Sequence, residues 1–310
     1  MTRFIICGII FPLLFTGIFL SCNDDSSDLH KEKEMRYLRQ YISENDIDVE
    51  PERSGLYYIP VHAGQGAKPS AGDWLIISYT ARTLFNQVFD TTDEDVAIRN
   101  NIHSSNQIYG DRRLELDAIM VSGLKEGLKM TREGGAATLI VPSHLGFGSK
   151  GTGVVAPYTT LIYDFELVKV IDDPAAYEEE LIEKYLESYT DSTHLVVTAR
   201  ESGLYYIELV EGTGNNHPEE EDRVDVYYLG TFTDGRVFDT NIGGSLFSFP
   251  IGAEAAIPGF EEGVMLMKPG GRSRIIVPSV LAYGEHGSGE KIPGYTPLVF
   301  DIELFDIRTP

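Results

Sequence analysis

Residues 259–267 read Gly-Phe-Glu-Glu-Gly-Val-Met-Leu-Met, and this stretch decides the fold of the C-terminal third of the chain. Its apolar residues Phe260, Val264 and Met267 recur at helical spacing, which predicts one short helix with a single buried face. The sequence on both sides alternates apolar and polar residues, as half-buried strands do, at Val224, Val226, Tyr228 and Phe232 and at Leu298, Phe300, Ile302 and Leu304. Residues 233–236, Thr-Asp-Gly-Arg, are typical of a hairpin turn. We therefore predict an α+β fold in which a curved antiparallel sheet is wrapped around one short helix.

The same unit occurs twice in the 310 residues. Residues 54–59 and 202–207 both read Ser-Gly-Leu-Tyr-Tyr-Ile, and Phe-Asp recurs at 89–90 and 238–239. These matches have offsets of 148 and 149, whereas Val-Pro-Ser at 141–143 and 277–279 has an offset of 136. The first repeat therefore carries extra residues between Asp90 and Gly123, and we expect the polar segment 91–113 to be a long surface loop.

Each repeat follows an amphipathic helical pattern. Apolar residues lie at helical spacing at Met35, Leu38 and Ile42 and again at Tyr177, Leu181, Tyr185 and Tyr189. Asp173 followed by Pro174 is a typical helix start. We favour packing of these helices on their own domains, or a role as spacers, over a dedicated partner-binding role. The expected organisation is 1–21 leader, 22–50 tether and helix, 51–172 first domain, 173–198 linker helix and 199–310 second domain.

The N-terminus has the pattern of a secretory signal. Arg3 precedes an uncharged apolar run at residues 4–20, and Leu20-Ser21-Cys22 follows. This resembles the lipobox of bacterial lipoproteins, which implies cleavage before Cys22, a lipid on its thiol, and a place in the bacterial envelope, at the outer membrane. The alternative is a plain transmembrane anchor, but a run of 17 residues that contains Pro12 is short for a span.

Composition excludes several classes of function. The formal charge is −23, from 25 Lys and Arg against 48 Asp and Glu, so the chain is a poor candidate for binding nucleic acid. The two cysteines are Cys7 and Cys22, so processing would leave no thiol for a disulfide or a catalytic nucleophile. The seven histidines lack metal-ligand spacing, and the sequence contains no phosphate loop or nucleophile elbow. We expect the acidic residues 23–28 to form a solvated tether.

The second repeat resembles FKBP-type peptidyl-prolyl cis-trans isomerases in seven blocks that occur in order and at the family's spacing. The blocks are Val226-Tyr-Tyr-Leu-Gly230, Asp234-Gly-Arg-Val-Phe-Asp239, Phe247-Ser-Phe-Pro-Ile-Gly252, Ile257-Pro-Gly-Phe-Glu-Glu-Gly-Val264, Leu281-Ala-Tyr-Gly284, Lys291-Ile-Pro293 and Leu298-Val-Phe-Asp-Ile-Glu-Leu304. The resemblance covers residues 199–310. It implies catalysis of X–Pro isomerisation on proline-containing polypeptides, a role in protein folding, and no cofactor or metal.

The resemblance also implies roles for individual residues. Tyr228, Phe238, Phe247 and Phe300 would be aromatic walls, and Phe260 would form the floor. The backbone N–H of Ile257 would bind the carbonyl that follows the proline, Asp239 and Tyr283 would be the polar groups, and Ile292 would cap the rim. Lys291 stands where the family often has a hydrophobic residue. Taken singly, each aromatic residue is also consistent with an ordinary core position, Asp239 with a turn acid and Tyr283 with a structural hydrogen bond.

The first repeat keeps Tyr79, Phe89 and Asp90 but departs from the pattern elsewhere. Leu124 replaces the floor aromatic, Phe147 replaces Tyr283, and Tyr163 replaces Phe300. Residues 154–157, Val-Val-Ala-Pro, keep a hydrophobic rim, and Leu114-Glu115-Leu116 is the nearest counterpart of the Phe-x-Phe block. Two functions are therefore open: an envelope prolyl isomerase that acts through the second repeat, or a non-catalytic protein that binds peptides or a surface partner through both repeats.

Overall fold

A computed structural model of the chain describes residues 24–310 except 215 and 290. The expected leader, 1–21, and Cys22 lie outside the described residues. The chain divides into two compact units, 1–47 and 48–310, and helix α1 (Asp24–Glu44) is the described element of the first. Most of the segment expected to be a tether, residues 23–28, is helical, because α1 begins at Asp24. No helix in the described part of the chain is both long and apolar enough to cross a membrane.

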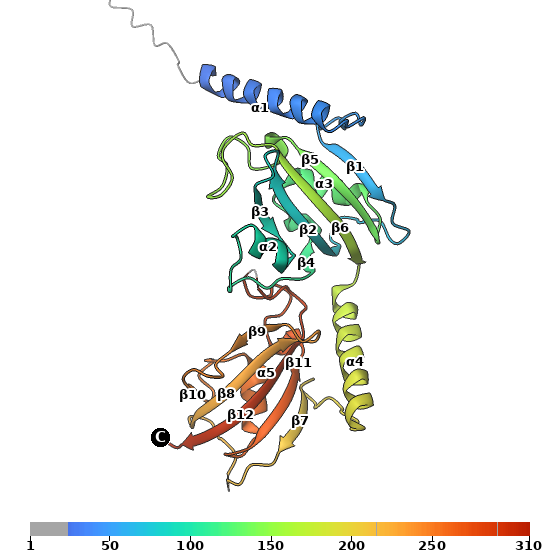
Figure 1. Cartoon of the computed structure of the whole chain (residues 1–310). Helices are drawn as coiled ribbons and strands as arrows, with labels where there is room; N and C mark the ends of the chain where they lie inside the picture. Colours follow the sequence, from blue (N-terminus) through green and yellow to red (C-terminus); the bar gives the residue numbers. More distant parts are fainter. Residues whose placement is uncertain (1–23, 215, 290) are drawn as a thin grey trace, which may run out of the picture. The chain divides into compact units, whose positions relative to one another are not determined.

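The second unit contains two lobes, each built on a six-stranded antiparallel sheet (Figure 1). In the first lobe the strand order is β1-β5-β6-β2-β3, and β4 also pairs with β2. The strands are β1 (Tyr57–His62), β2 (Trp74–Thr83), β3 (Val88–Thr91), β4 (Arg112–Glu115), β5 (Gly135–Val141) and β6 (Leu161–Ile171). The helices are α2 (Glu94–Arg99), α3 (Ser122–Met130) and the 3-10 turns η1 (Leu116–Ala118) and η2 (Ser143–Leu145).

The second lobe repeats this topology, in the order β7-β11-β12-β8-β10 with β9 also paired to β8. Its strands are β7 (Tyr205–Val210), β8 (Arg223–Phe232), β9 (Val237–Thr240), β10 (Phe247–Pro250), β11 (Arg272–Val277) and β12 (Leu298–Arg308). Its helices are α5 (Pro258–Met265) and η3 (Ser279–Leu281). The α+β fold, the strands on both sides of the short helix and the hairpin turn are confirmed; Gly235 has the positive φ that the turn needs.

Helices α3 and α5 lie directly on their sheets because glycines face the strands. A Cβ atom at Gly263 would lie 2.9 Å from Ile275 Cδ1, and one at Gly127 would lie 2.5 Å from Leu139 Cδ1. Both distances are shorter than normal van der Waals contact, so a larger residue would require the facing side chain or the helix to shift. The apolar faces of these helices, including Phe260 and Val264, are thereby buried in the lobe cores.

The repeated Ser-Gly-Leu motif attaches the first strand of each lobe to its helix. Ser54 Oγ donates to Glu126 on α3, and Ser202 Oγ donates to Glu262 on α5, each at 2.8 Å. The leucine that follows two residues later is completely buried in both copies. The exact repeat at 54–59 and 202–207 is thus explained by a shared contact between strand and helix.

The polar segment 91–113 is more ordered than the surface loop that we expected. It contains α2 and the first two residues of β4, and its first residue, Thr91, ends β3. Asp93 caps α2 by accepting a hydrogen bond from Val96 N at 2.9 Å. We call residues 92–111, between β3 and β4, the insertion.

Helix α4 (Pro174–Thr193) follows the first lobe and packs on the sheet of the second (Figure 1). Its side chains Ile182 and Tyr189 contact Ile207, Ile276 and Val299, as expected for packing on its own domain. The start predicted at Asp173 and Pro174 is confirmed, because Asp173 accepts hydrogen bonds from Ala175 N and Ala176 N. Glu178 is 8% exposed and accepts hydrogen bonds from Ser279 N at 2.5 Å and Ser279 Oγ at 2.6 Å.

We predict that Glu178→Ala destabilises the second lobe by ~1.5–3 kcal/mol, because it leaves the backbone N–H and the hydroxyl of buried Ser279 without their acceptor. Urea unfolding followed by circular dichroism measures the loss. Fluorescence of Trp74, the chain's single tryptophan, reports in the same experiment on its contact with Tyr295 of the second lobe. Glu179→Ala, on the exposed side of α4, is the matched control, and equal stability of the two variants would contradict the assigned contact.

Candidate functional site

The second lobe brings together the aromatic residues that the sequence singled out. The ring of Tyr228 on β8 lies 5.6 Å from Phe260, 6.1 Å from Phe247 and 6.3 Å from Phe300, measured between centroids. All three pairs of rings meet edge to face, an arrangement that aromatic quadrupoles prefer. Phe260 enters this group from α5, 5.1 Å from Phe300.

The remaining apolar residues of the expected pocket belong to the same cluster. Phe238 on β9 lies 5.5 Å from Phe300, and Ile292 is buried among the residues of this core. Tyr228, Phe247 and Ile257 pack against the cluster but stay partly accessible. Rings from β8, β9, β10, β12 and α5 therefore form one apolar surface whose edge remains open to solvent.

Asp239 lies at the polar edge of this cluster. Its Oδ2 accepts a hydrogen bond from the Tyr228 hydroxyl at 2.8 Å, and its Oδ1 accepts one from Thr240 N at 2.9 Å. Burial raises the pKa of the Tyr228 hydroxyl, and the hydrogen bond to Asp239 raises it further, so Tyr228 stays protonated and donates. The pKa of Tyr283 is also raised, first by burial and then by the negative charge of Asp239.

Ile257 is the N-cap of α5 and offers a free backbone donor. Its carbonyl accepts hydrogen bonds from Phe260 N at 2.9 Å and Glu261 N at 3.2 Å. Its own N–H has no acceptor among the residues that the structure describes. A substrate carbonyl at this point would supply one, beside the exposed edge of the aromatic cluster.

The first lobe has the same frame with different chemistry. Tyr79 donates to Asp90 Oδ2 at 2.6 Å, as Tyr228 does to Asp239, and the Tyr163 ring lies 6.1 Å from Tyr79. Arg112 has no counterpart in the second lobe: its Nη1 donates to the Tyr79 hydroxyl at 2.5 Å and lies 3.7 Å from Asp90 Oδ2. Among described residues, no cation comes within ion-pair distance of Asp239, so the two carboxylates differ in their electrostatic surroundings.

Strand register identifies what Arg112 replaces. In the second lobe Phe247 pairs with Val226, two residues before Tyr228; in the first lobe Arg112 pairs with Ile77, two residues before Tyr79. Arg112 therefore occupies the position of the aromatic wall Phe247, and Leu114 that of Phe249. The segment Leu114-Glu115-Leu116 therefore corresponds to the part of the block that begins at Phe249. Arg112 was not identified from the sequence as the counterpart of Phe247. Val155, which is buried, takes the place of Ile292. In the first lobe Thr152 N donates to the carbonyl of Val155, and in the second lobe Ser288 N donates to the carbonyl of Ile292.

Tyr163 and Phe147 fill the other positions expected of them in the first lobe. Phe89 lies 6.2 Å from Phe147 and 6.3 Å from Tyr163, and Leu124 is buried on α3 where the second lobe has Phe260. Burial raises the pKa of the Tyr163 hydroxyl, and the charge of Asp90 raises it further. In the described residues no group of three or more His, Cys, Asp or Glu side chains is placed to hold a metal ion.

Two segments of the chain, 65–168 and 214–305, match the family model described as FKBP-type peptidyl-prolyl cis-trans isomerase. Over 147 residues the chain is 42% identical to an isomerase named FkpA of Aeromonas hydrophila, which covers 47% of this chain and 53% of the relative. Over 125 residues it is 39% identical to a 22 kDa FKBP-type isomerase of Escherichia coli strain K12, covering 40% and 58%. The chain thus spans about half the length of these curated relatives.

A solved structure, FkpA from Escherichia coli, is 35% identical in sequence and superposes with a TM-score of 0.39. The match covers 44% of this chain and 61% of that one.

We predict that Phe260→Ala destabilises the second lobe by ~3–5 kcal/mol, because it removes the ring that touches Tyr228, Phe300 and Phe249. Phe260→Leu, which copies Leu124 of the first lobe, should cost less because it leaves a smaller cavity. Urea unfolding of the full chain measures both losses. Wild-type stability of Phe260→Ala would show that this ring does not hold the cluster together.

Proposed function

We propose that this chain, which belongs to the FKBP-type peptidyl-prolyl cis-trans isomerase family, accelerates X–Pro isomerisation in unfolded polypeptides, mainly through its second lobe. The observation that carries this proposal is the cluster of Tyr228, Phe238, Phe247, Phe260 and Phe300 with Asp239 hydrogen-bonded at its edge. The reaction is a rotation about one C–N bond, which needs no nucleophile, metal or cofactor.

The apolar cluster suits the chemistry of the twisted amide. Rotation about an X–Pro bond crosses a barrier of ~18–20 kcal/mol because the planar amide is stabilised by resonance. The twisted amide has lost this resonance, and with it part of the charge separation between oxygen and nitrogen. A dry aromatic surface therefore stabilises the twisted amide more than the planar one, and the flat pyrrolidine ring packs on aromatic side chains.

The polar groups at the edge would hold the peptide in place. The free N–H of Ile257 is available to the carbonyl that follows the proline, which fixes the chain on one side of the rotating bond. Asp239 adds a negative field beside this bond and keeps the Tyr228 hydroxyl pointed toward itself. Tyr283, which is 39% exposed, is available to the rotating carbonyl. Ile292 closes the apolar rim.

The first lobe is better suited to binding than to catalysis. Arg112 brings a cation to the position of an aromatic wall and pairs with Asp90, so this site is wetter and its carboxylate is neutralised. Leu124 also leaves a smaller apolar floor than Phe260. We propose that this lobe holds polypeptide without isomerising it efficiently, and that the two domains extend over 51–172 and 199–310.

The setting of this activity follows from the N-terminal sequence. We propose that residues 1–21 are removed, that Cys22 is lipidated, and that the protein assists folding in the bacterial envelope, anchored at the outer membrane. The family relatives support a folding catalyst, while the lipobox-like Leu20-Ser21-Cys22 supports the anchor.

We predict that Asp239→Asn in the full chain folds normally, binds a proline peptide with wild-type affinity and isomerises it about tenfold more slowly, a change of ~1.4 kcal/mol in the barrier. The substitution keeps the side-chain volume and removes the charge beside the rotating bond. Exchange spectroscopy by NMR, which needs no protease, measures the rate. Asp90→Asn in the first lobe is the matched variant and should retain nearly full activity. Equal losses from the two variants would contradict catalysis by the second lobe.

We predict that Cys22→Ser abolishes lipid attachment and leaves either an uncleaved precursor or a soluble protein. Metabolic labelling with a fatty acid and membrane fractionation measure the result in a bacterial host. A variant that is still processed normally and found in the membrane fraction would show that the anchor lies elsewhere.

A further inference from the structure

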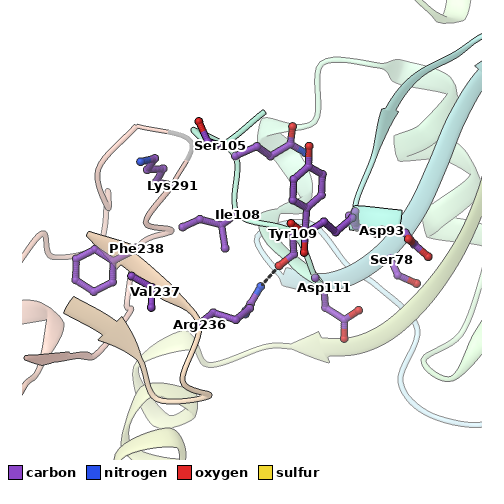
Figure 2. Close-up of a pocket in the computed structure, with 14 residues that line it drawn as sticks. Ser78, Asp93, Ser105, Ile108, Tyr109, Asp111, Arg236, Val237, Phe238 and Lys291 are labelled. Atoms are coloured by element: carbon purple, nitrogen blue, oxygen red, sulfur yellow. Dashed lines mark hydrogen bonds between the residues drawn. The ribbon is translucent and has the colours of Figure 1, made fainter. Parts of the chain in front are cut away.

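A cavity of about 600 Å³ lies between the insertion of the first lobe and strand β9 of the second (Figure 2). The insertion lines it with Ile108, Tyr109 and Asp111 among other residues. The second lobe contributes Arg236, Val237, Phe238 and Lys291. All of these residues belong to the same compact unit, 48–310. The volume is within the range of ordinary ligand sites and is sufficient for several side chains.

Specific contacts hold the insertion in this position. Arg236 Nη1 donates to the carbonyl of Tyr109 at 3.0 Å, as Figure 2 shows, and Ile108 packs against the core cluster of the second lobe. Just after the insertion, Arg113 Nη2 donates to the Gly294 carbonyl at 2.6 Å and to Thr296 Oγ1. These bonds attach β4 and the insertion to the loop that precedes β12.

The cavity borders the aromatic cluster of the second lobe through Phe238. Phe238 lines the cavity and also lies 5.5 Å from Phe300 within the cluster. Lys291, on the cavity wall, directly precedes the rim residue Ile292. A polypeptide whose proline lies on the cluster therefore has neighbouring residues within reach of the cavity.

The lining determines which side chains would fit. Ile108, Val237 and Phe238 provide apolar surface, and Val237 is 50% exposed although it lies on a strand. The carboxylates of Asp93 and Glu94 are already engaged, with Val96 N and His103 respectively. The Lys291 ammonium lines the cavity, is exposed, and has no partner among the residues that the structure describes.

We propose that the insertion of the first lobe forms an extended substrate subsite for the second lobe, an inference that rests on the proposed isomerase function. The subsite takes residues that flank the proline in an unfolded polypeptide. An apolar side chain lies between Ile108 and Val237, and an acidic side chain lies at Lys291. The first lobe thereby contributes to substrate selection without catalysing the reaction.

The test compares a short and a long substrate in the full-length protein. The short one is Ala-Leu-Pro-Phe; the long one is a 16-residue peptide with the same centre, flanked by leucine and glutamate residues. We expect Ile108→Ser to lower kcat/KM for the long peptide about fivefold relative to the short one. Ile98→Ser, on α2 of the same insertion and 54% exposed outside the cavity, should leave this ratio unchanged. An unchanged ratio for Ile108→Ser would overturn the proposal.

A second variant tests the charge and guards against misfolding of the first. Lys291→Glu should reverse the preference of the protein for glutamate over lysine in the flanks of the long peptide. The same preference in this variant and in wild type would overturn the assignment of Lys291.

Failure of the isomerase function has a different signature. In that case neither peptide is isomerised by the wild-type protein. Calorimetry then compares binding of the long peptide to the wild-type protein and to Ile108→Ser. Weaker binding to the variant supports the subsite, and equal binding overturns it.

Discussion

The close contact between helix and sheet is the constraint on which the rest of each lobe depends. Gly259 and Gly263 have no side chains, so α5 packs on Val277 and Ile275 of β11 where an added Cβ would overlap these side chains unless they or the helix shifted. This approach sets how far Phe260 reaches into the aromatic cluster and where the N-cap residue Ile257 presents its N–H. If α5 moved away from the sheet by the width of a methyl group, Phe260 would separate from Tyr228 on β8 and Phe300 on β12. Closely packed interiors do not accommodate such shifts without loss of stability.

The two lobes show that the same frame supports different chemistry. Both keep a tyrosine that donates to an aspartate on the neighbouring strand, at 2.6 Å in the first lobe and 2.8 Å in the second. In the first lobe Arg112 pairs with that aspartate, so the pair contributes little net field, and a guanidinium retains water where a ring would exclude it. In the second lobe the ring of Phe247 takes the corresponding position, and no described residue forms an ion pair with Asp239.

Local patterns in the sequence predicted the parts of this fold that depend on local physics. Alternation gave β8 and β12, the spacing of Phe260 and Val264 gave α5, and Asp173 with Pro174 gave the start of α4. The role of Arg112 was not predicted, because it depends on which residue of β4 pairs with Ile77, and a short polar strand carries no periodic signal for its register. Helix α2 was missed for a similar reason: six residues are too few to show a helical period, and the Asp93 cap was the one available sign.

Residues that join the two lobes were also beyond the reach of sequence patterns, since each contact links positions more than 100 residues apart. Glu178 with Ser279, Arg113 with Gly294 and Arg236 with Tyr109 each look like ordinary surface residues in the sequence. The first contact attaches α4 to the second lobe, and the other two attach β4 and the insertion to it. The fold is present in two copies, and the extra residues in the first copy lie against Phe238 and Lys291 of the second lobe. The first lobe, which has Arg112 where the second lobe has the ring of Phe247, therefore still borders the aromatic cluster of the second lobe through its insertion.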